Sequence, residues 1–332
     1  IGFHICKRLV LNDDEVIGFD NLNSYYDINL KKARLNLLKK YKKNWKFIKL
    51  DIEKEEYKIK EIFDKFRPNI VIHLAAQAGV RYSLENPKAY IKANLNGFYN
   101  IIEYSRLFEI RNFIYASSSS VYGGNAKVPF VEKDSTNHPV SIYAATKRSN
   151  ELIAHSYSHL YSLPCTGLRF FTVYGPWGRP DMAPMIFAKA IYAKQPIKIF
   201  NNGNMSRDFT YIDDAVESIF KLIDKPAISD EHFNKNDPDP SKSWAPYQIL
   251  NIGNSNPINL MMFIKSLEKE IGQDAIKIFE PMQNGDIEKT FADTNLMQEI
   301  IGLYSTTNLQ SGIKKFISWY KDFYKIWFFF IF

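Results

Sequence analysis

The sequence predicts an α/β protein, with a Rossmann-type doubly wound parallel sheet in the first half and a smaller α/β domain after it. Short apolar runs rich in β-branched residues alternate with segments whose apolar residues recur at helical spacing. Because consecutive parallel strands need crossover helices, this alternation indicates a sheet covered on both faces. The 332 residues also suffice for two domains, at about 150 residues per domain.

The first half contains the strongest element patterns. Strands are expected at residues 15–19, 45–50, 70–74 and 113–116, and helices at residues 3–11, 30–41, 58–66 and 90–108. The first helix begins directly after Gly2, with no strand ahead of it. The sequence therefore predicts that this chain lacks the first strand of its sheet and most of the glycine loop that follows such a strand.

After about residue 175 the pattern loosens into connections rich in Pro, Asn and Gly, including an expected surface loop at 229–246. We place the first domain at residues 1–175 and the second at 176–325, with some segments of the second returning to the first. Residues 326–332 form an apolar tail that is too short to cross a membrane.

Composition excludes several classes of protein. The formal charge is +7, but only ten of the 43 basic residues are arginines and the lysines are scattered, which argues against nucleic-acid binding. No apolar stretch reaches the length of a membrane span, and no signal peptide opens the chain. The two cysteines, Cys6 and Cys165, cannot build a disulfide framework, which predicts a reducing, cytoplasmic location.

Asp20 is the first candidate for ligand binding. It ends the strand at 15–19 and follows Gly2 by 18 residues, near the spacing of about 20 between a glycine loop and a ribose-binding acid. A carboxylate there accepts hydrogen bonds from both ribose hydroxyls and repels a 2′-phosphate. The sequence therefore predicts binding of NAD rather than NADP, although an Asp after a strand is also a common turn residue.

Tyr143 and Lys147 form the second candidate site. Four residues apart on a helix, they share one face, so the lysine ammonium can lower the pKa of the phenol from about 10 toward neutrality. The serine run at 117–120, at the end of a strand, offers a hydroxyl that can bind the same substrate oxygen. Tyr-x-x-x-Lys alone is usually a surface pair, but the serine run and Asp20 make it specific.

With these residues, nearly all of the chain up to residue 325 resembles the extended short-chain dehydrogenase/reductase family, and within it the nucleotide-sugar 4-epimerases, closest to UDP-glucuronate 4-epimerase. The resemblance rests on segments 19–23, 73–81, 117–123, 143–147, 169–182, 207–214 and 282–286.

The resemblance implies NAD as a retained cofactor, and 4-epimerisation of a UDP-sugar through a transient 4-keto intermediate. Tyr143 would exchange a proton with the 4-hydroxyl, Lys147 would hold the nicotinamide ribose, and Ser118, or Ser120 as the second choice, would bind the 4-oxygen. The remaining implied cofactor contacts are Gly2, Asp20, Asn21, Asn23, Asp51, Ile52, Leu74, Ala75, Gln77, Asn94 and Phe170.

For the substrate, the resemblance implies that Arg207 binds the pyrophosphate, with Phe200 and Gln283 at the uracil and Arg81 as a further contact. The segment before Val121 contains only serines where related dehydratases and decarboxylases carry an acid. Epimerisation needs no such acid. Ser120, Thr172 and Arg179 are suited to clamp the carboxylate of a uronate, although Thr172 is equally expected as a buried strand residue.

Asp213 and Asp214 are read as a helix cap rather than a metal site, so no metal is expected. The family further implies a homodimer, paired through the helices at 90–108 and 144–161.

Two alternatives stay open. One is a 4-epimerase for UDP-glucose or UDP-N-acetylglucosamine. The other, prompted by the missing strand and the apolar tail, is an inactive remnant that binds NAD poorly.

Overall fold

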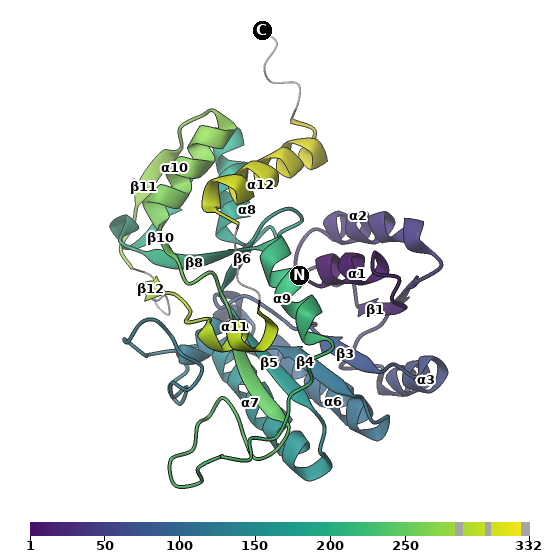
Figure 1. The fold of residues 1–332 in the computed structure, drawn as a ribbon. Helices are drawn as coiled ribbons and strands as arrows, with labels where there is room; N and C mark the ends of the chain where they lie inside the picture. The colour runs from purple at the N-terminus through teal and green to yellow at the C-terminus, as the bar shows by residue number, and fades with distance from the viewer. Residues whose placement is uncertain (283–287, 303–306, 327–332) are drawn as a thin grey trace.

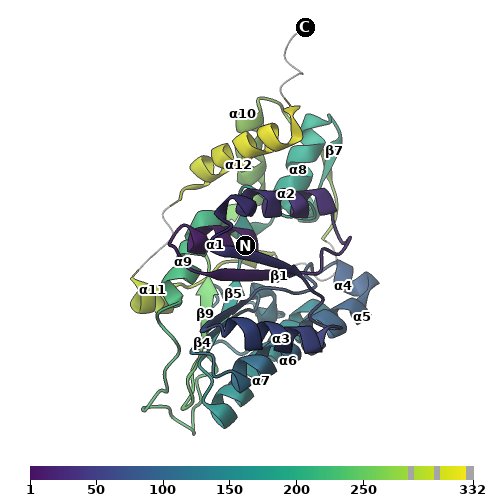
Figure 2. The ribbon, with the colours of Figure 1, turned by 90° about the vertical axis from the view of Figure 1, so that its right-hand side faces the viewer.

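The structure is a computed structural model that describes residues 1–282, 288–302 and 307–326, and it confirms the predicted α/β class. The first lobe contains a parallel sheet in the order β3-β4-β5-β9, and the second lobe lies beyond the carboxyl ends of these strands (Figures 1 and 2). The strands are β3 (Ile70–His73), β4 (Asn112–Ala116), β5 (Cys165–Phe170) and β9 (Tyr247–Ile252).

Helices cover both faces of this sheet (Figure 2). One face carries α3 (Glu56–Phe66), α6 (Gly97–Leu107) and α7 (Ile142–Tyr161), and the other carries α1 (Gly2–Val10), α9 (Ile212–Leu222) and α11 (Asn295–Ile301). Successive residues of β4 alternate between the two faces, as the period of a strand requires. Phe113 and Tyr115 pack with α3, α6 and α7, whereas Ile114 packs with α1 and α9.

Two further strands, β1 (Val16–Asp20) and β2 (Trp45–Lys49), pair in parallel beside this sheet, and α2 (Ile28–Leu38) lies between them in sequence. In the described part of the chain β1 does not pair with β3, and residues of both strands line one large cavity. Helix α1 spans Gly2–Val10, one residue earlier at each end than the predicted 3–11. The inference that a first strand is missing stays a prediction.

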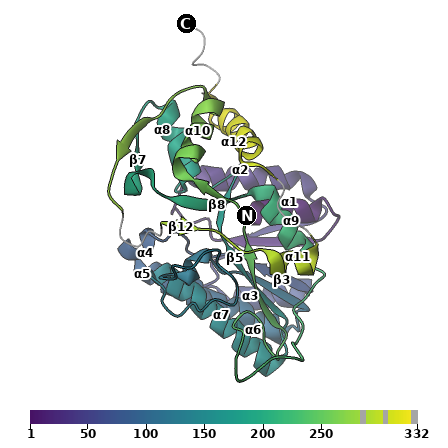
Figure 3. The ribbon, with the colours of Figure 1, turned by 60° about the vertical axis from the view of Figure 1, so that its left-hand side comes forward.

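The second lobe is built around β8 (Ser206–Tyr211), which pairs in parallel with β6 (Thr172–Tyr174) and β12 (Lys289–Thr290) and antiparallel with β10 (Pro257–Asn259). A separate parallel pair joins β7 (Pro196–Ile199) to β11 (Ile276–Phe279). Helices α8 (Ala183–Tyr192), α10 (Leu260–Ile271) and α12 (Leu309–Tyr324) pack against these strands (Figure 3).

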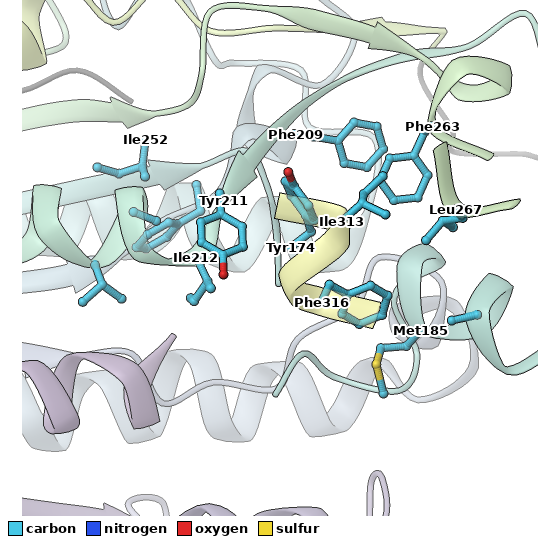
Figure 4. Close-up of a cluster of buried hydrophobic side chains, with 14 of the residues drawn as sticks. Tyr174, Met185, Phe209, Tyr211, Ile212, Ile252, Phe263, Leu267, Ile313 and Phe316 are labelled. Atoms are coloured by element: carbon cyan, nitrogen blue, oxygen red, sulfur yellow. The ribbon is translucent and has the colours of Figure 1, made fainter. Parts of the chain in front are cut away.

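Aromatic side chains form the centre of the second lobe (Figure 4). The rings of Phe209 and Phe263 stack with centroids 4.2 Å apart, and Tyr174 meets both rings edge-on. Tyr174 follows β5 after a short connection, so this core holds the segment that leaves the first lobe. The packing thereby fixes the second lobe over the ends of the parallel strands.

The chain crosses between the lobes more than once. β9 follows α9 and the loop at 229–246, and it pairs in parallel with β5 of the first lobe along its whole length. The predicted boundaries at residues 175 and 325 stay predictions, and residues 327–332 of the apolar tail lie outside the described residues.

Short helical elements fill several connections. They are η1 (Lys39–Tyr41), α4 (Tyr82–Glu85), α5 (Pro87–Tyr90), the π-helical turn η2 (Ile91–Asn96), η3 (Ser119–Tyr122) and η4 (Phe200–Gly203). Tyr211, rather than the predicted Asp213 and Asp214, is the N-cap of α9; the two acids lie in its first turn. No helix in the described ranges is long and apolar enough to cross a membrane.

Candidate active site

A cavity of about 1220 Å³ runs between β1 and β3 and past the carboxyl ends of the parallel strands, and most of the predicted site residues line it. Parallel sheets commonly bind ligands at this edge. The lining residues include Gly2, Asp20, Asn21, Asn23, Asp51, Ile52, Leu74, Ala75, Gln77, Ser118, Ser120, Tyr143, Lys147, Phe170, Thr172, Arg179 and Arg207. Asn94, Arg81 and Phe200 lie outside this lining, and Gln283 falls outside the described residues.

Tyr143 stands in the first turn of α7, at the wall of the cavity. The helix starts there because the Ser141 hydroxyl accepts a hydrogen bond from the Ala144 amide at 3.1 Å. Burial raises the pKa of Tyr143, while a hydrogen bond with Ser118 and the positive charge of Arg179 oppose that rise. The phenol therefore has both a polar partner and a nearby cation, the surroundings that a proton-transferring tyrosine needs.

Lys147 lies one turn further along the same face of α7. Its side chain is only 3% exposed, and its ammonium donates a hydrogen bond to the carbonyl of Ala116 at 2.7 Å. Burial lowers the pKa of Lys147 to about 8. The predicted action of Lys147 on the phenol stays a prediction, since Arg179 is the cation that opposes the rise in the pKa of Tyr143 here.

The serine run forms a tight turn directly after β4. Ser118 is the N-cap of η3, and its hydroxyl oxygen accepts hydrogen bonds from the Ser120 amide at 3.2 Å and the Ser120 hydroxyl at 2.9 Å. The turn ends at Gly123, whose φ of +51° and close approach to the His138 carbonyl leave no room for a side chain. Both serines line the cavity with Tyr143; Ser118 opposes the rise in the pKa of Tyr143, and Ser120 donates a hydrogen bond to Ser118.

The other end of the cavity has the acceptors that an adenosine ribose requires. The Asp20 carboxylate is 47% exposed and takes a hydrogen bond from the Leu22 amide at 2.6 Å. Asn21 donates to a carboxylate oxygen of Asp51 at 3.3 Å, which joins the ends of β1 and β2. Because the Asp20 carboxylate remains accessible, these residues fit the diol of a dinucleotide better than a 2′-phosphate.

Two basic residues at this end were missed by the sequence analysis. Lys31 on α2 is 7% exposed and donates to Asp20 at 3.4 Å and to Asn23 at 3.1 Å, so it fixes the loop between them. Arg34 donates to the carbonyl of Trp177 at 2.6 Å and thereby holds the connection that carries Arg179. Both residues lie in a helix whose polar residues are expected to face solvent, so no local pattern predicts that Lys31 and Arg34 line the site.

Asn94 lies behind the cavity wall. Its side chain accepts a hydrogen bond from the Gln77 amide at 2.8 Å and donates to the Gln77 carbonyl at 3.0 Å and to Thr146 at 3.0 Å. These bonds tie the segment after β3 to α7. The predicted direct contact of Asn94 with the cofactor stays a prediction.

The basic residues predicted for the substrate come from separate connections. Arg179 lies 3.5 Å from a carboxylate oxygen of Asp181, and Arg207 on β8 donates to the carbonyls of Ser206 and Glu288. The guanidinium of Arg81 lies over the ring of Phe200 at 5.1 Å. Thr172 begins β6 and faces the cavity while partly buried.

Glu132 is a buried acid behind the serine turn, and it gives a pH prediction. Burial raises its pKa to about 7, against the pull of the Asn251 amide, which donates to it at 2.8 Å. The folded state thus holds a proton that the unfolded chain releases near pH 4.5, so stability falls as the pH rises toward 7.

Glu132→Gln keeps an acceptor for Asn251 and removes this penalty. We expect the parent to lose stability between pH 5 and pH 8 while the variant does not. The difference in free energy of unfolding, variant minus parent, should therefore rise by up to about 3 kcal/mol over that range. Urea denaturation at both pH values measures the difference. Parallel pH dependences for parent and variant would show that Glu132 is ionised normally.

Comparisons with known proteins agree with this site. The model described as the NAD dependent epimerase/dehydratase family matches residues 1–234. Protein CapI of Staphylococcus aureus is 50% identical over 325 residues, covering 98% of this chain and 96% of that protein. A probable UDP-glucuronate 4-epimerase of Rhizobium meliloti is 44% identical over 326 residues, covering 98% of this chain and 95% of that protein.

Solved structures are similar over the same length. UDP-glucuronic acid 4-epimerase from Bacillus cereus, in complex with UDP-glucuronic acid and NAD, has a TM-score of 0.83 and 29% identity, covering 98% of this chain and 96% of that chain. UDP-glucose 4-epimerase from Thermotoga maritima has a TM-score of 0.82 and 28% identity, covering 97% and 96%. The family match and the geometry of the cavity agree: the chain belongs to the NAD dependent epimerase/dehydratase family.

Proposed function

We propose that this protein is an NAD-dependent isomerase that interconverts UDP-glucuronate and UDP-galacturonate. The observation that carries the proposal is that Ser118, Tyr143 and Lys147 line one cavity together with the Asp20 carboxylate. Ser118 and Arg179 also oppose the rise that burial causes in the pKa of Tyr143. Relatives named as UDP-glucuronate 4-epimerases, 42–44% identical over 98% of this chain, support it. The alternative of an inactive remnant has no support in these comparisons.

Each residue of the central group has a defined task. Tyr143 takes the proton of the sugar 4-hydroxyl and returns it, while Ser118 hydrogen-bonds the same oxygen. Bound NAD would accept the hydride of carbon 4 and give it back on the opposite face of the 4-keto sugar. Lys147 holds the nicotinamide ribose, and its ammonium favours the ionised form of the phenol.

The rest of the cavity binds the two nucleotides. The residues proposed for the cofactor are Gly2, Asp20, Asn21, Asn23, Asp51, Ile52, Leu74, Ala75, Gln77, Asn94 and Phe170, and those for the substrate are Arg81, Thr172, Arg179, Phe200, Arg207 and Gln283. Arg207 offers a planar donor fork suited to the pyrophosphate.

A uronate adds a hazard that the site must control. The 4-keto intermediate is a β-keto acid, which loses carbon dioxide when its carboxylate bond aligns with the ketone. Arg179, Ser120 and Thr172 are proposed to hold that carboxylate out of alignment. The turn that contains Ser118 and Ser120 has no acidic side chain that could protonate carbon 5.

Arg179→Gln tests this assignment. A charge-assisted hydrogen bond contributes about 1.5–3 kcal/mol, so we expect kcat/KM for UDP-glucuronate to fall about 10- to 100-fold further than kcat/KM for UDP-glucose. Steady-state kinetics with both sugars measures that ratio. Because Arg179 also acts on Tyr143, an equal loss with both sugars would limit Arg179 to acid–base chemistry.

The substrate itself is tested by incubating the purified protein separately with UDP-glucuronate, UDP-glucose and UDP-N-acetylglucosamine and following each by NMR. We expect only UDP-glucuronate to equilibrate rapidly with its 4-epimer. Exclusive turnover of a neutral sugar would replace the proposal by the other 4-epimerase activity. Turnover of none of the three would leave both without support.

We further propose a cytoplasmic homodimer. Exposed apolar side chains on α6 and α7, including Tyr99, Leu152 and Leu160, offer a face for a second copy, and Cys6 and Cys165 are free thiols, as suits a reducing compartment. Sedimentation of the protein at micromolar concentration tests the dimer, and a monomer at these concentrations would contradict it.

A further inference from the structure

A buried carboxylate lies two turns beyond Tyr143 on α7. The Glu151 side chain is fully buried and accepts hydrogen bonds from four donor groups. Oε1 takes one from the Ser117 hydroxyl at 2.6 Å and one from Arg169 Nε at 2.9 Å. Oε2 takes one from Arg169 Nη2 at 3.0 Å and one from Arg148 at 2.8 Å. Every acceptor position of this carboxylate is therefore in use.

Arg169 connects the same carboxylate to the far end of the serine turn. Its side chain is fully buried in β5, its Nη1 donates to the carbonyl of Glu132 at 3.0 Å, and its guanidinium lies 4.8 Å from the centre of the Tyr122 ring. Tyr122 is the last residue of η3, and its hydroxyl donates to Asn251 on β9 at 2.7 Å.

The ion pair consequently holds both ends of the turn that contains Ser118. Ser117, which precedes the turn, donates a hydrogen bond to Glu151. Tyr122, which ends the turn, packs its ring against the guanidinium of Arg169. On the helix side, Lys147 is bonded to Ala116, the residue before Ser117. Contacts that involve neither the Ser118 hydroxyl nor the Tyr143 phenol therefore hold both ends of the serine turn and tie α7 to the end of β4.

We propose that Glu151, paired with Arg169, is a positioning residue that holds Ser118 against Tyr143 in the geometry that the reaction needs. The inference rests on the proposed epimerase function and adds to it a residue that does not line the cavity. A displacement of about 1 Å between reacting groups can cost about 100-fold in rate, so the loss of this anchor should reduce turnover rather than binding.

Stability alone does not account for a buried ion pair. Replacing such a pair by apolar residues of similar volume is often neutral or stabilising, whereas removing one partner is costly. A double substitution to apolar residues can therefore recover stability without recovering the bonds to Ser117 and Glu132. If the ion pair has only a structural role, the double variant should recover its activity together with its stability. If the pair positions Ser118, the double variant should stay slow although it is stable.

The experiment compares Glu151→Gln, Ser117→Ala and the double variant Glu151→Leu with Arg169→Met, in the NAD-containing protein with UDP-glucuronate. The glutamine side chain has nearly the same volume as glutamate, but an amide N–H₂ replaces one carboxylate oxygen. That group cannot accept hydrogen bonds, so part of the network of Glu151 with Ser117, Arg169 and Arg148 is lost. We expect kcat to fall about 10- to 100-fold in Glu151→Gln, with KM within about twofold of the parent and NAD retained. Ser117→Ala, which removes one bond, should show a smaller fall in kcat.

The double variant should melt at a higher temperature than Glu151→Gln and yet keep the low kcat. Asp230→Asn, which breaks an ion pair with Lys242 in the distant 229–246 loop, is the matched control and should keep the parent kcat. Parent-like kcat in the double variant or in Glu151→Gln would overturn the proposal. If Glu151→Gln fails to fold, an unchanged kcat in Ser117→Ala overturns it instead.

Failure of the proposed function has a different signature. A parent protein that converts no UDP-sugar refutes that function before any variant is compared. An active parent with unaffected variants refutes only the role of Glu151.

Discussion

Tyr143→Phe is expected to lower the turnover of UDP-glucuronate by about 10²- to 10⁴-fold, the usual contribution of a positioned proton-transfer group. The substitution removes only the phenol hydroxyl, and the ring can keep its edge-on contact with Tyr90, 6.0 Å between centroids. Bound NAD and the KM for the sugar should therefore change little. Initial rates, together with the NAD content of the purified variant, measure both effects.

Tyr192→Phe is a matched control for the loss of a tyrosine hydroxyl. Tyr192 lies in the second lobe with its ring stacked on Tyr320, and no hydrogen-bond partner is found for its hydroxyl among the described residues. This variant should keep the parent rate. A Tyr143→Phe protein with parent-like turnover would show that another group moves the proton of the 4-hydroxyl.

Arg169→Met is expected to lower the free energy of unfolding by about 3–5 kcal/mol, because it leaves the Glu151 carboxylate buried without its main counter-charge. Burial by itself raises the pKa of Glu151, and the charge and hydrogen bonds of Arg169 reverse that effect, so the pKa lies below its usual value. Without Arg169 the carboxyl should take up a proton more readily. Urea denaturation at neutral pH measures the loss.

Arg67→Met supplies the exposed counterpart of this change. Arg67 forms an ion pair with Asp64 at the surface, with 70% of its side chain exposed, and surface pairs contribute little. Its loss should leave the unfolding midpoint unchanged. Equal, small effects of the two substitutions would contradict the account of Glu151 and Arg169 as a buried charge pair.

The local elements of the fold follow from the sequence because their patterns are local. Apolar, β-branched runs mark β1, β2, β3 and β4, and helical spacing marks α3 and α6. Tyr143 and Lys147 share a helix face for the same reason. The position of Asp20 could be predicted because it depends only on the end of a strand and on the spacing from Gly2.

Residues that act through long-range contacts could not be predicted in this way. Arg169 and Glu151 come from different elements, and Arg34 meets Trp177 across 143 positions. Glu151 did carry one usable signal, since it follows Lys147 by four residues on the face of α7 that holds the site. No sequence pattern marks Lys31 as buried, because a lysine in a helix normally indicates a position exposed to solvent.

The second lobe shows the same limit for strand pairing. β8 pairs with strands from three separate parts of the chain, β6, β10 and β12, each only two or three residues long. Strands this short have no clear alternation, so neither their existence nor their order can be read from the residues. The arrangement is set by the shared aromatic core instead.

The central claim is that carbon 4 of UDP-glucuronate loses a hydride and regains the same one on its opposite face. The most direct measurement uses UDP-glucuronate labelled with deuterium at carbon 4, incubated with the protein in ordinary water and analysed by NMR. The account predicts UDP-galacturonate that still carries the deuterium at carbon 4. Product with hydrogen from water at that carbon would contradict it.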